Sequence, residues 1–440
     1  MEIYFYLPIS AQDIICNINN KKCFTKKIFS FQIVYLEKDN GDSLVVLNPR
    51  WLCSDIIGNL ISHEKIVQSR ITGCFSVDEF QIMYPETDAL DLLNLLEALE
   101  VCTRCEVDDD DIEYEFPCLN FVETLNGLWQ RDVKHFGNAV YGGIRITSSE
   151  SVAQLKHIFP RVQTHLRRNI VQENDDPDSD LYQWHHGSKY CCGELEGMIS
   201  MDRQEQFIEI KVRGPPESAT ALFYFLEDFV NTTDQVIAHI IPGIHTEKLA
   251  LSPSGLKDHM KISHSFTAKE ILTAELNKSS TLVLPNGKKE SFNDVMFMGS
   301  SEVRNGVCIG VDLPIGCMPF HTRQLLCQIM DPQDPLGRDW CLLAVTLGLE
   351  TCLPSLDSTN IKSDSKTERT LEEWSRVEPN ATIGQLMQRL EEFNREDAVE
   401  ALLCRSPLFR TLVYDEQSTD ESAAPVIGTA STNTLSNLSR

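Results

Sequence analysis

The most constraining feature of the sequence is a series of short amphipathic helices near its carboxyl end. Residues 339–349 read D-W-C-L-L-A-V-T-L-G-L, with apolar residues at i, i+3, i+4 and i+7 and a glycine near the end. This spacing is typical of one face of a short helix that a glycine terminates. Residues 365–368 (S-K-T-E) and 382–385 (T-I-G-Q) match the capping box that begins a helix, because two backbone donors are satisfied reciprocally there.

The same region therefore predicts a helical bundle. Asn394 is expected to cap the last helix, and residues 321–330 and 351–356 supply two further helices. Six short helices joined by tight turns pack as a compact antiparallel bundle. The apolar residues predicted to form the structural core of this bundle are Trp340, Leu343, Leu347, Leu371, Trp374, Leu386, Leu390 and Leu402.

Length and composition are those of a multidomain globular protein. The chain has 440 residues, of which 42% are hydrophobic and 24% are charged, and roughly 150 residues per domain allow two to four domains. Its 39 basic and 65 acidic residues give a formal charge of −26. This balance argues against a nucleic-acid partner and against attraction to anionic lipids.

The sequence favours a cytosolic setting. Residues 1–30 are left without a fold and lack the pattern of a secretory leader. No window approaches about 18 uninterrupted apolar residues, so no membrane span is predicted. The 15 cysteines are accordingly expected to be free thiols in a reducing compartment.

Residues 31–124 are expected to form a hairpin followed by a winged-helix-like unit. Two β-rich runs in residues 31–47 flank an Asn-Gly turn, and Asn48 opens a helix whose buried side would hold Trp51, Ile56, Leu60 and Ile61. A capping box at 76–79, a helix over 88–101 and paired strands over 112–121 follow. Such a module often binds DNA, but the acidic run beginning at Glu106 would repel phosphate.

Residues 125–315 are predicted to form an α+β unit. Residues 139–146 and 206–212 have the pattern of strands, and residues 149–169 and 217–241 have that of helices. The acidic stretch 173–180 is expected to be a solvated loop. A boundary is predicted at Pro314, Pro319, Pro332 and Pro335, before an almost entirely helical region over 321–413. The Ser/Thr-rich tail 414–440 is expected to be disordered.

No motif of an enzyme is recognised in the sequence. A phosphate-binding P-loop, the kinase signature motifs, HExxH and the nucleophile elbow are all missing from these 440 residues. The chain is therefore predicted to be non-catalytic and to hold no cofactor.

Two clusters of cysteine and histidine leave alternatives open. Cys102 and Cys105 have the spacing of half a zinc site, with Cys118 nearby, although apolar packing of these thiols is favoured because no second ligand pair follows. His185 and His186 precede Cys191 and Cys192. These residues could be the pair of a thiol hydrolase, or they could simply lie at the end of a strand, and the second interpretation is favoured.

The carboxyl-terminal pattern resembles a death domain. The opening D-W-x-x-L-A-x-x-L-G-L, the L-x-x-W helix and the close ending in R-x-D-A-x-x-x-L occur in that order over residues 321–408. Upstream, residues 45–62, the helices up to Val101, and residues 127–146 resemble the COR segment of Roc–COR (Roco) proteins. Together they are similar to the carboxy-terminal half of the death-associated protein kinase family, and they imply a multidomain α+β chain that ends in an all-α bundle and a tail.

The resemblance implies a regulatory or adaptor role in apoptotic signal transduction. The death domain would recruit signalling partners through charged helical faces, and the COR-like part would dock a GTP-binding domain and support a dimer. Alternatively, the chain is part of a calmodulin-regulated Ser/Thr kinase whose kinase, ankyrin and GTP-binding parts are absent here. Cytoplasmic and cytoskeletal locations are expected. The residues predicted to bind partners are Glu368, Arg369, Glu372, Glu373, Arg376, Arg389, Glu391, Glu392, Arg395 and Glu396.

Overall fold

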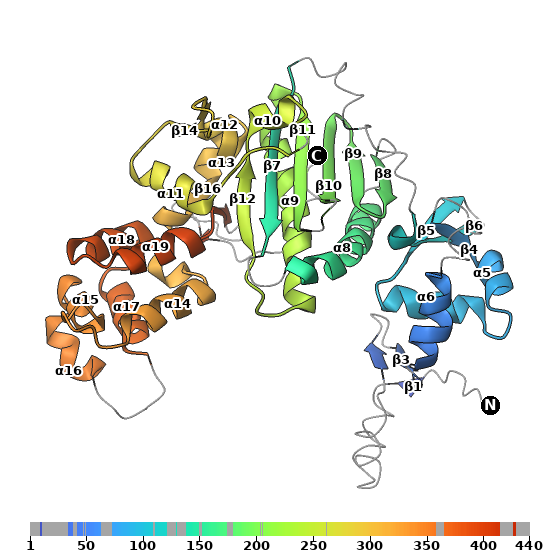
Figure 1. Ribbon diagram of the computed structural model, residues 1–440, viewed down its shortest axis with the longest axis horizontal. Helices are drawn as coiled ribbons and strands as arrows, with labels where there is room; N and C mark the ends of the chain where they lie inside the picture. Colours follow the sequence, from blue (N-terminus) through green and yellow to red (C-terminus); the bar gives the residue numbers. More distant parts are fainter. Residues whose placement is uncertain are drawn as a thin grey trace, which may run out of the picture. The chain divides into compact units, whose positions relative to one another are not determined.

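The computed structural model separates into two compact units (Figure 1). The first comprises residues 1–131 and 157–190, and the second comprises residues 132–156 and 191–440. The structure describes residues 9–10, 34–37, 42–46, 48, 50–62, 73–108, 111–120, 129, 138–148, 152–173, 179–202, 204, 206–260, 262–357, 365–413 and 426–427. Within these residues the fold is mixed α+β with a helical carboxyl-terminal region.

The first unit begins with the predicted hairpin. β2 (Val34–Glu37) and β3 (Asp42–Val46) pair antiparallel, while the Asn-Gly turn itself lies outside the described residues. Residues 1–30, left without a fold by the sequence, contribute one short strand, β1 (Ile9–Ser10), which pairs with β3. The three strands form a small sheet in the order β1-β3-β2.

The first helix of this unit is wound differently from the prediction. η1 (Trp51–Ile57) is a π-helix that continues into α3 (Gly58–Leu60), and the side chain of Asn48 accepts a hydrogen bond from the amide of Trp51 at 3.2 Å. Ile56 and Leu60 are buried as predicted, but Ile61 is 52% exposed. Ile61 follows the last residue of α3, where the backbone leaves the helical conformation (φ −90°, ψ 7°), so the predicted helical face does not extend to this residue.

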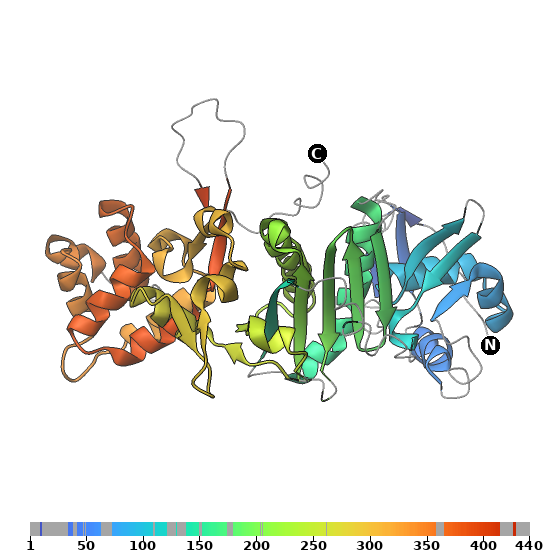
Figure 2. The same ribbon diagram turned by 90° about the horizontal axis from the view of Figure 1, so that it is seen from above.

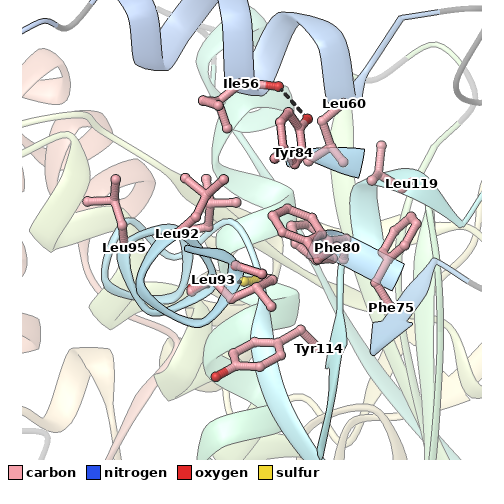
Figure 3. Close-up of a cluster of buried hydrophobic side chains, with 14 of the residues drawn as sticks. Ile56, Leu60, Phe75, Phe80, Tyr84, Leu92, Leu93, Leu95, Tyr114 and Leu119 are labelled. Atoms are coloured by element: carbon pink, nitrogen blue, oxygen red, sulfur yellow. Dashed lines mark hydrogen bonds between the residues drawn. The ribbon is translucent and has the colours of Figure 1, made fainter. Parts of the chain in front are cut away.

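Two helices and a three-stranded sheet enclose the core of the first unit (Figure 3). The capping box at Ser76 is confirmed, whereas the second helix ends three residues earlier than predicted, before Glu100 adopts a left-handed conformation. The strands follow the order β4-β6-β5. The elements are β4 (Cys74–Ser76), α5 (Val77–Met83), α6 (Ala89–Ala98), β5 (Thr103–Asp108), β6 (Asp111–Glu115) and η2 (Pro117–Leu119).

Aromatic rings pack against one another in this core, beside a larger number of leucines. The ring of Phe116 lies 5.6 Å from Phe75 and 5.9 Å from Phe80, centroid to centroid. The hydroxyl of Tyr84 donates to the carbonyl of Ile56 at 2.9 Å, which the dashed line in Figure 3 marks. Because aromatic pairs add to the free energy of burial, this cluster holds η1 against the sheet and helices.

A long helix and a strand pair complete the first unit. α8 (Val152–Glu173) contributes its residues from 157 onward, and β8 (Ser179–Trp184) lies beside β9 (Gly187–Cys192). Nε2 of His165 and the carboxylate of Glu100 form a hydrogen bond at 2.8 Å, and Arg167 forms an ion pair with Glu115 at 2.7 Å. The predicted acidic loop lies outside the described residues apart from its two ends, which belong to α8 and β8.

The second unit contains an antiparallel sheet with one long helix along it (Figures 1 and 2). Its strands β7 (Val140–Thr147), β10 (Leu195–Met201), β11 (Phe207–Gly214), β12 (Glu247–Leu251) and β13 (Ser265–Phe266) follow the order β13-β12-β7-β11-β10. The helix is α9 (Ala219–Ile240), preceded by η4 (Pro216–Ser218). A Cβ atom on Gly197 would lie 2.6 Å from the ring of Phe229, so α9 and the sheet approach closely there.

Short elements connect this sheet to the helical region. They are α10 (Pro253–Lys257), α11 (Ala268–Leu276), β14 (Thr281–Val283), β15 (Lys289–Ser291), α12 (Phe292–Phe297), α13 (Ser301–Gly306), β16 (Val307–Ile309), η5 (Gly310–Asp312) and η6 (Ile315–Cys317). These elements and the helical region belong to one compact unit.

Each segment predicted to be helical in the carboxyl-terminal region is helical in the structure. The segments are α14 (Phe320–Met330), α15 (Trp340–Thr346), η7 (Glu350–Cys352) with α16 (Leu353–Leu356), α17 (Lys366–Val377), α18 (Ile383–Glu392) and α19 (Glu396–Arg405). The predicted capping box at Thr382 is present, and Gly348 adopts the left-handed conformation that ends a helix.

Three local predictions in this region were wrong. Ser365 caps α17, but no reciprocal bond from Glu368 completes a capping box. Arg395, not Asn394, is the residue before α19, and Asn394 adopts φ 58°. The region is not helical to residue 413, because β17 (Phe409–Val413) is a strand that pairs with β16 and with β18 (Val426–Ile427), inside the tail predicted to be disordered.

Candidate interaction surface of the helical bundle

The predicted core residues hold the bundle together. Seven of the eight are buried, with exposures of 0 to 7%: Trp340, Leu343, Leu371, Trp374, Leu386, Leu390 and Leu402. Leu347 is only half-buried. Leu349, which follows Gly348, is 2% exposed and is buried in its place. Because these apolar side chains are buried, the opposite face of each helix is the one that can be exposed to solvent.

The predicted surface residues of α17 differ in their environments. Glu368 is half-buried, and its carboxylate accepts a hydrogen bond from Arg323 at 2.8 Å. Arg369 is half-buried as well and donates to the carbonyl of Leu356 at 3.5 Å. Glu372 and Arg376 are exposed, and Arg376 pairs with Glu373 at 2.9 Å. The second half of α17 therefore presents charge to solvent, whereas its first turn is engaged within the bundle.

The end of α18 is a second exposed charged surface. Arg389, Glu391 and Glu392 are exposed, and Arg389 pairs with Glu392 at 3.2 Å. Glu396 is exposed at the start of α19. Side chains three residues apart on a helix lie on the same face, so Arg389 neutralises the charge of Glu392. The negative charges of Glu391 and Glu396 are not neutralised by a basic neighbour in their own helices.

Arg395 does not lie on the surface that the sequence predicted. It is 7% exposed, and its guanidinium binds both carboxylate oxygens of Asp397, at 2.8 and 2.9 Å. It also donates to the carbonyl of Ile329 at 2.8 Å and to that of Arg338. A planar guanidinium with five donors suits such a multiple contact, and Arg395 therefore joins α19 to the end of α14 and the following loop.

A second side of the bundle is covered by the part of the chain that precedes it, and the sequence did not predict this contact. β16 pairs with β17, and Lys269 of α11 forms an ion pair with Glu400 of α19 at 2.6 Å. Figure 1 shows α11 beside α18 and α19. The only signal in the sequence was the apolar pattern V-C-I-G-V at residues 307–311, which is too short to assign to a strand with a distant partner.

A cavity of about 730 Å³ lies within the second unit. Its wall includes Leu226, Glu227 and Val230 of α9, Lys248 of β12, and residues 404–409 at the end of α19. Burial and the neighbouring carboxylate of Asp228 raise the pKa of Glu227 to about 7, while a hydrogen bond from Thr411 and the charge of Lys248 oppose this shift. Lys248 itself is paired with Asp234.

The cysteine and histidine clusters have ordinary packing partners. The thiol of Cys102 is buried and contacts the carbonyl of Leu93 at 3.9 Å, and burial raises the pKa values of Cys105 and Cys118 to about 11. Nδ1 of His185 hydrogen-bonds the carbonyl of Cys118 at 2.9 Å. Among the described residues, no group of three or more His, Cys, Asp or Glu side chains is arranged to hold a metal ion.

Within the described part of the chain, none of the helices combines the length and the apolar character that crossing a bilayer requires.

The helical region belongs to a known class of domain. Residues 323–403 match the family model of the death domain, which supports a role for this chain in protein interaction and in apoptotic signalling. The chain is also similar to the death-associated protein kinase dapk-1 of Caenorhabditis elegans, at 33% identity over 398 residues. This similarity covers 88% of the chain but 27% of the relative, so the chain spans about a quarter of that kinase's length.

Proposed function

We propose that this chain is a non-catalytic regulatory and adaptor region in apoptotic signal transduction, and that it recruits protein partners through its death domain. The observation that carries the proposal is the death-domain match over residues 323–403, together with exposed charged side chains at the end of α17 and on α18. Complementary charges at such a surface steer encounter and set specificity more than they supply affinity.

The remaining expectations from the sequence belong to this proposal. The first unit and the sheet of the second would serve as a COR-like region, which docks a GTP-binding domain and supports a dimer. The winged-helix-like arrangement of α5, α6 and β4–β6 would then be a protein-interaction module, in keeping with the net charge of −26. The chain would act in the cytoplasm, in association with the cytoskeleton.

An alternative is that the chain acts as one part of a longer Ser/Thr kinase. Its similarity to about a quarter of a death-associated protein kinase favours this. The kinase, ankyrin and GTP-binding functions would then reside in sequence outside these 440 residues, and the death domain would supply the same recruitment to the larger protein.

Charge reversal on the exposed surface tests the proposal. Arg389→Glu and Glu372→Lys in the full chain should each reduce the amount of captured partner several-fold, because both side chains are exposed and neither is part of the core. Affinity capture with quantitative mass spectrometry compares them with wild type, and thermal unfolding should change little. Reversal of an exposed surface residue costs within about 0.5 kcal/mol.

The matched control is Glu194→Lys, which reverses an exposed carboxylate in the turn between β9 and β10. Capture should be retained in this variant. If both bundle variants retain every partner that wild type captures, recruitment does not use this surface and the proposal fails.

A further inference from the structure

The cavity in the second unit has the size and the lining of a small-molecule site. Its volume of about 730 Å³ lies within the range of about 300–1,000 Å³ that is typical of ligand pockets. More than half of the residues in its wall are apolar, and they come mainly from α9, β12, α12 and residues 404–409. Such a wall favours a ligand with an apolar body, because binding removes apolar surface from water.

Contacts between elements that are distant in the sequence hold this wall together. The ring of Phe223 in α9 lies 5.1 Å from that of Phe409 in β17, centroid to centroid. The hydroxyl of Thr322 in α14 donates to the carbonyl of Arg405 at 2.7 Å. All four residues line the cavity, and so does Cys404, which is exposed to solvent. The cavity is therefore preformed and reaches solvent beside Cys404.

The basic side chains of the wall already have acidic neighbours. Two of its three Lys and Arg residues form ion pairs, which are Lys248 with Asp234 and Lys269 with Glu400. The third, Arg405, acts on the thiol of Cys404 against the opposite charge of Glu247. An anionic ligand would therefore meet no unbalanced Lys or Arg side chain in this described wall.

Glu227 is the acidic side chain of the wall that lacks such a counterion. No basic residue in the described part of the chain forms an ion pair with it, and its carboxyl group accepts a hydrogen bond from Thr411. Asn231, one turn further along the same face of α9, also lines the cavity. Its side chain makes no hydrogen bond to another described residue. A carboxylate and an amide carbonyl can both accept from an ammonium group, which has three donors.

We propose that this cavity binds a small-molecule primary amine. The apolar body of the amine fills the space between α9, β12 and residues 404–409, and its ammonium group pairs with Glu227 and donates to Asn231. A neutral ligand would leave the ionised carboxylate buried without a countercharge, which is costly. The proposal is independent of the recruiting surface on α17 and α18 and does not rest on the proposed function.

Ligand-observed NMR titrations of the full chain test the proposal with two probes of the same shape, phenethylamine and phenethyl alcohol. At pH 8 the wild-type chain should bind the amine about tenfold more tightly than the alcohol, because only the amine forms a hydrogen bond between charged groups. Glu227→Gln keeps the shape of the side chain and should bring the two affinities to within about twofold of each other. The matched control is Glu217→Gln, at an exposed carboxylate just before α9, and it should retain the preference for the amine.

The pH dependence of binding provides a second measurement. Because the pKa of Glu227 is about 7 in the free chain, the amine must displace a proton at lower pH. Wild-type affinity for phenethylamine should therefore be about tenfold weaker at pH 6 than at pH 8, whereas affinity for the alcohol should stay within about twofold. Glu227→Gln should abolish this dependence.

Three results would overturn the proposal. The first is equal affinity of the wild-type chain for the two probes at pH 8. The second is no saturable binding of phenethylamine up to about 10 mM, since even a small ligand that fills an apolar cavity binds in this range. The third is a preference for the amine that survives Glu227→Gln, because the amine would then bind to the acidic surface of the chain rather than in the cavity.

Discussion

At the scale of residues, the environments of the charged side chains were the hardest feature to predict from the sequence. Glu227 and Arg395 are ordinary charged residues in the sequence, yet one lies in a cavity wall and the other is buried in the bundle. The acceptors of Arg395 are the carbonyls of Ile329 and Arg338, more than 50 residues away along the chain. The sequence predicted Arg395 as a partner-binding surface residue, because such distant acceptors leave no local pattern in the sequence.

Glu227 should make the stability of the chain depend on pH. Its pKa is raised to about 7 in the folded chain from the usual value of 4.5, so the folded state binds the proton more tightly than the unfolded state does. Stability should therefore fall as the pH rises from about 4.5 through 7. Glu227→Gln should raise the unfolding temperature relative to wild type at pH 8 and change it little at pH 4.5.

Thermal unfolding at both pH values provides the measurement, with Glu217→Gln as control because Glu217 is exposed just before α9. At either pH, the unfolding temperature of this control should stay close to that of wild type. An equal effect of Glu227→Gln at pH 4.5 and pH 8 would mean that the carboxyl group is not desolvated as described.

At the scale of elements, local signals predicted the helices and missed the strands that join them. The capping boxes at Ser76 and Thr382 are present, because a cap and its helix lie within four residues of each other. β16 and β17 contain three and five residues, and they pair across about 100 residues of intervening chain. Their pairing depends on the folded bundle between them, which periodicity in either segment does not indicate.

Arg395 is expected to determine how α19 is held against the rest of the bundle. Arg395→Ala removes the bidentate contact with Asp397 and the hydrogen bonds to two carbonyls. It should lower the free energy of unfolding by about 2–3 kcal/mol, since buried acceptors lose a charged donor. Urea unfolding gives this value, and Arg389→Ala, on an exposed neighbour, should cost under about 0.5 kcal/mol. Equal costs for the two substitutions would contradict the buried role of Arg395.

At the scale of the whole molecule, composition and motifs predicted the class of the carboxyl-terminal domain. The death domain and the similarity to a death-associated protein kinase agree with the resemblance seen in the sequence. The bundle, however, shares one compact unit with the sheet of the α+β part. The predicted boundary at Pro314 and Pro319 stays a prediction, and residues beside these prolines, Leu313, Ile315 and Met318, are buried.

The central claim is that the death domain recruits proteins through the exposed side of α17 and α18. Hydrogen–deuterium exchange of the full chain, bound to a purified partner obtained by affinity capture, tests it most directly. We expect slower exchange in α17 from Glu372 onward and at the end of α18, with residues 307–318 and α11 unchanged. Protection confined to the first unit or to the sheet of the second, with α17 and α18 exchanging as in the free chain, would contradict it.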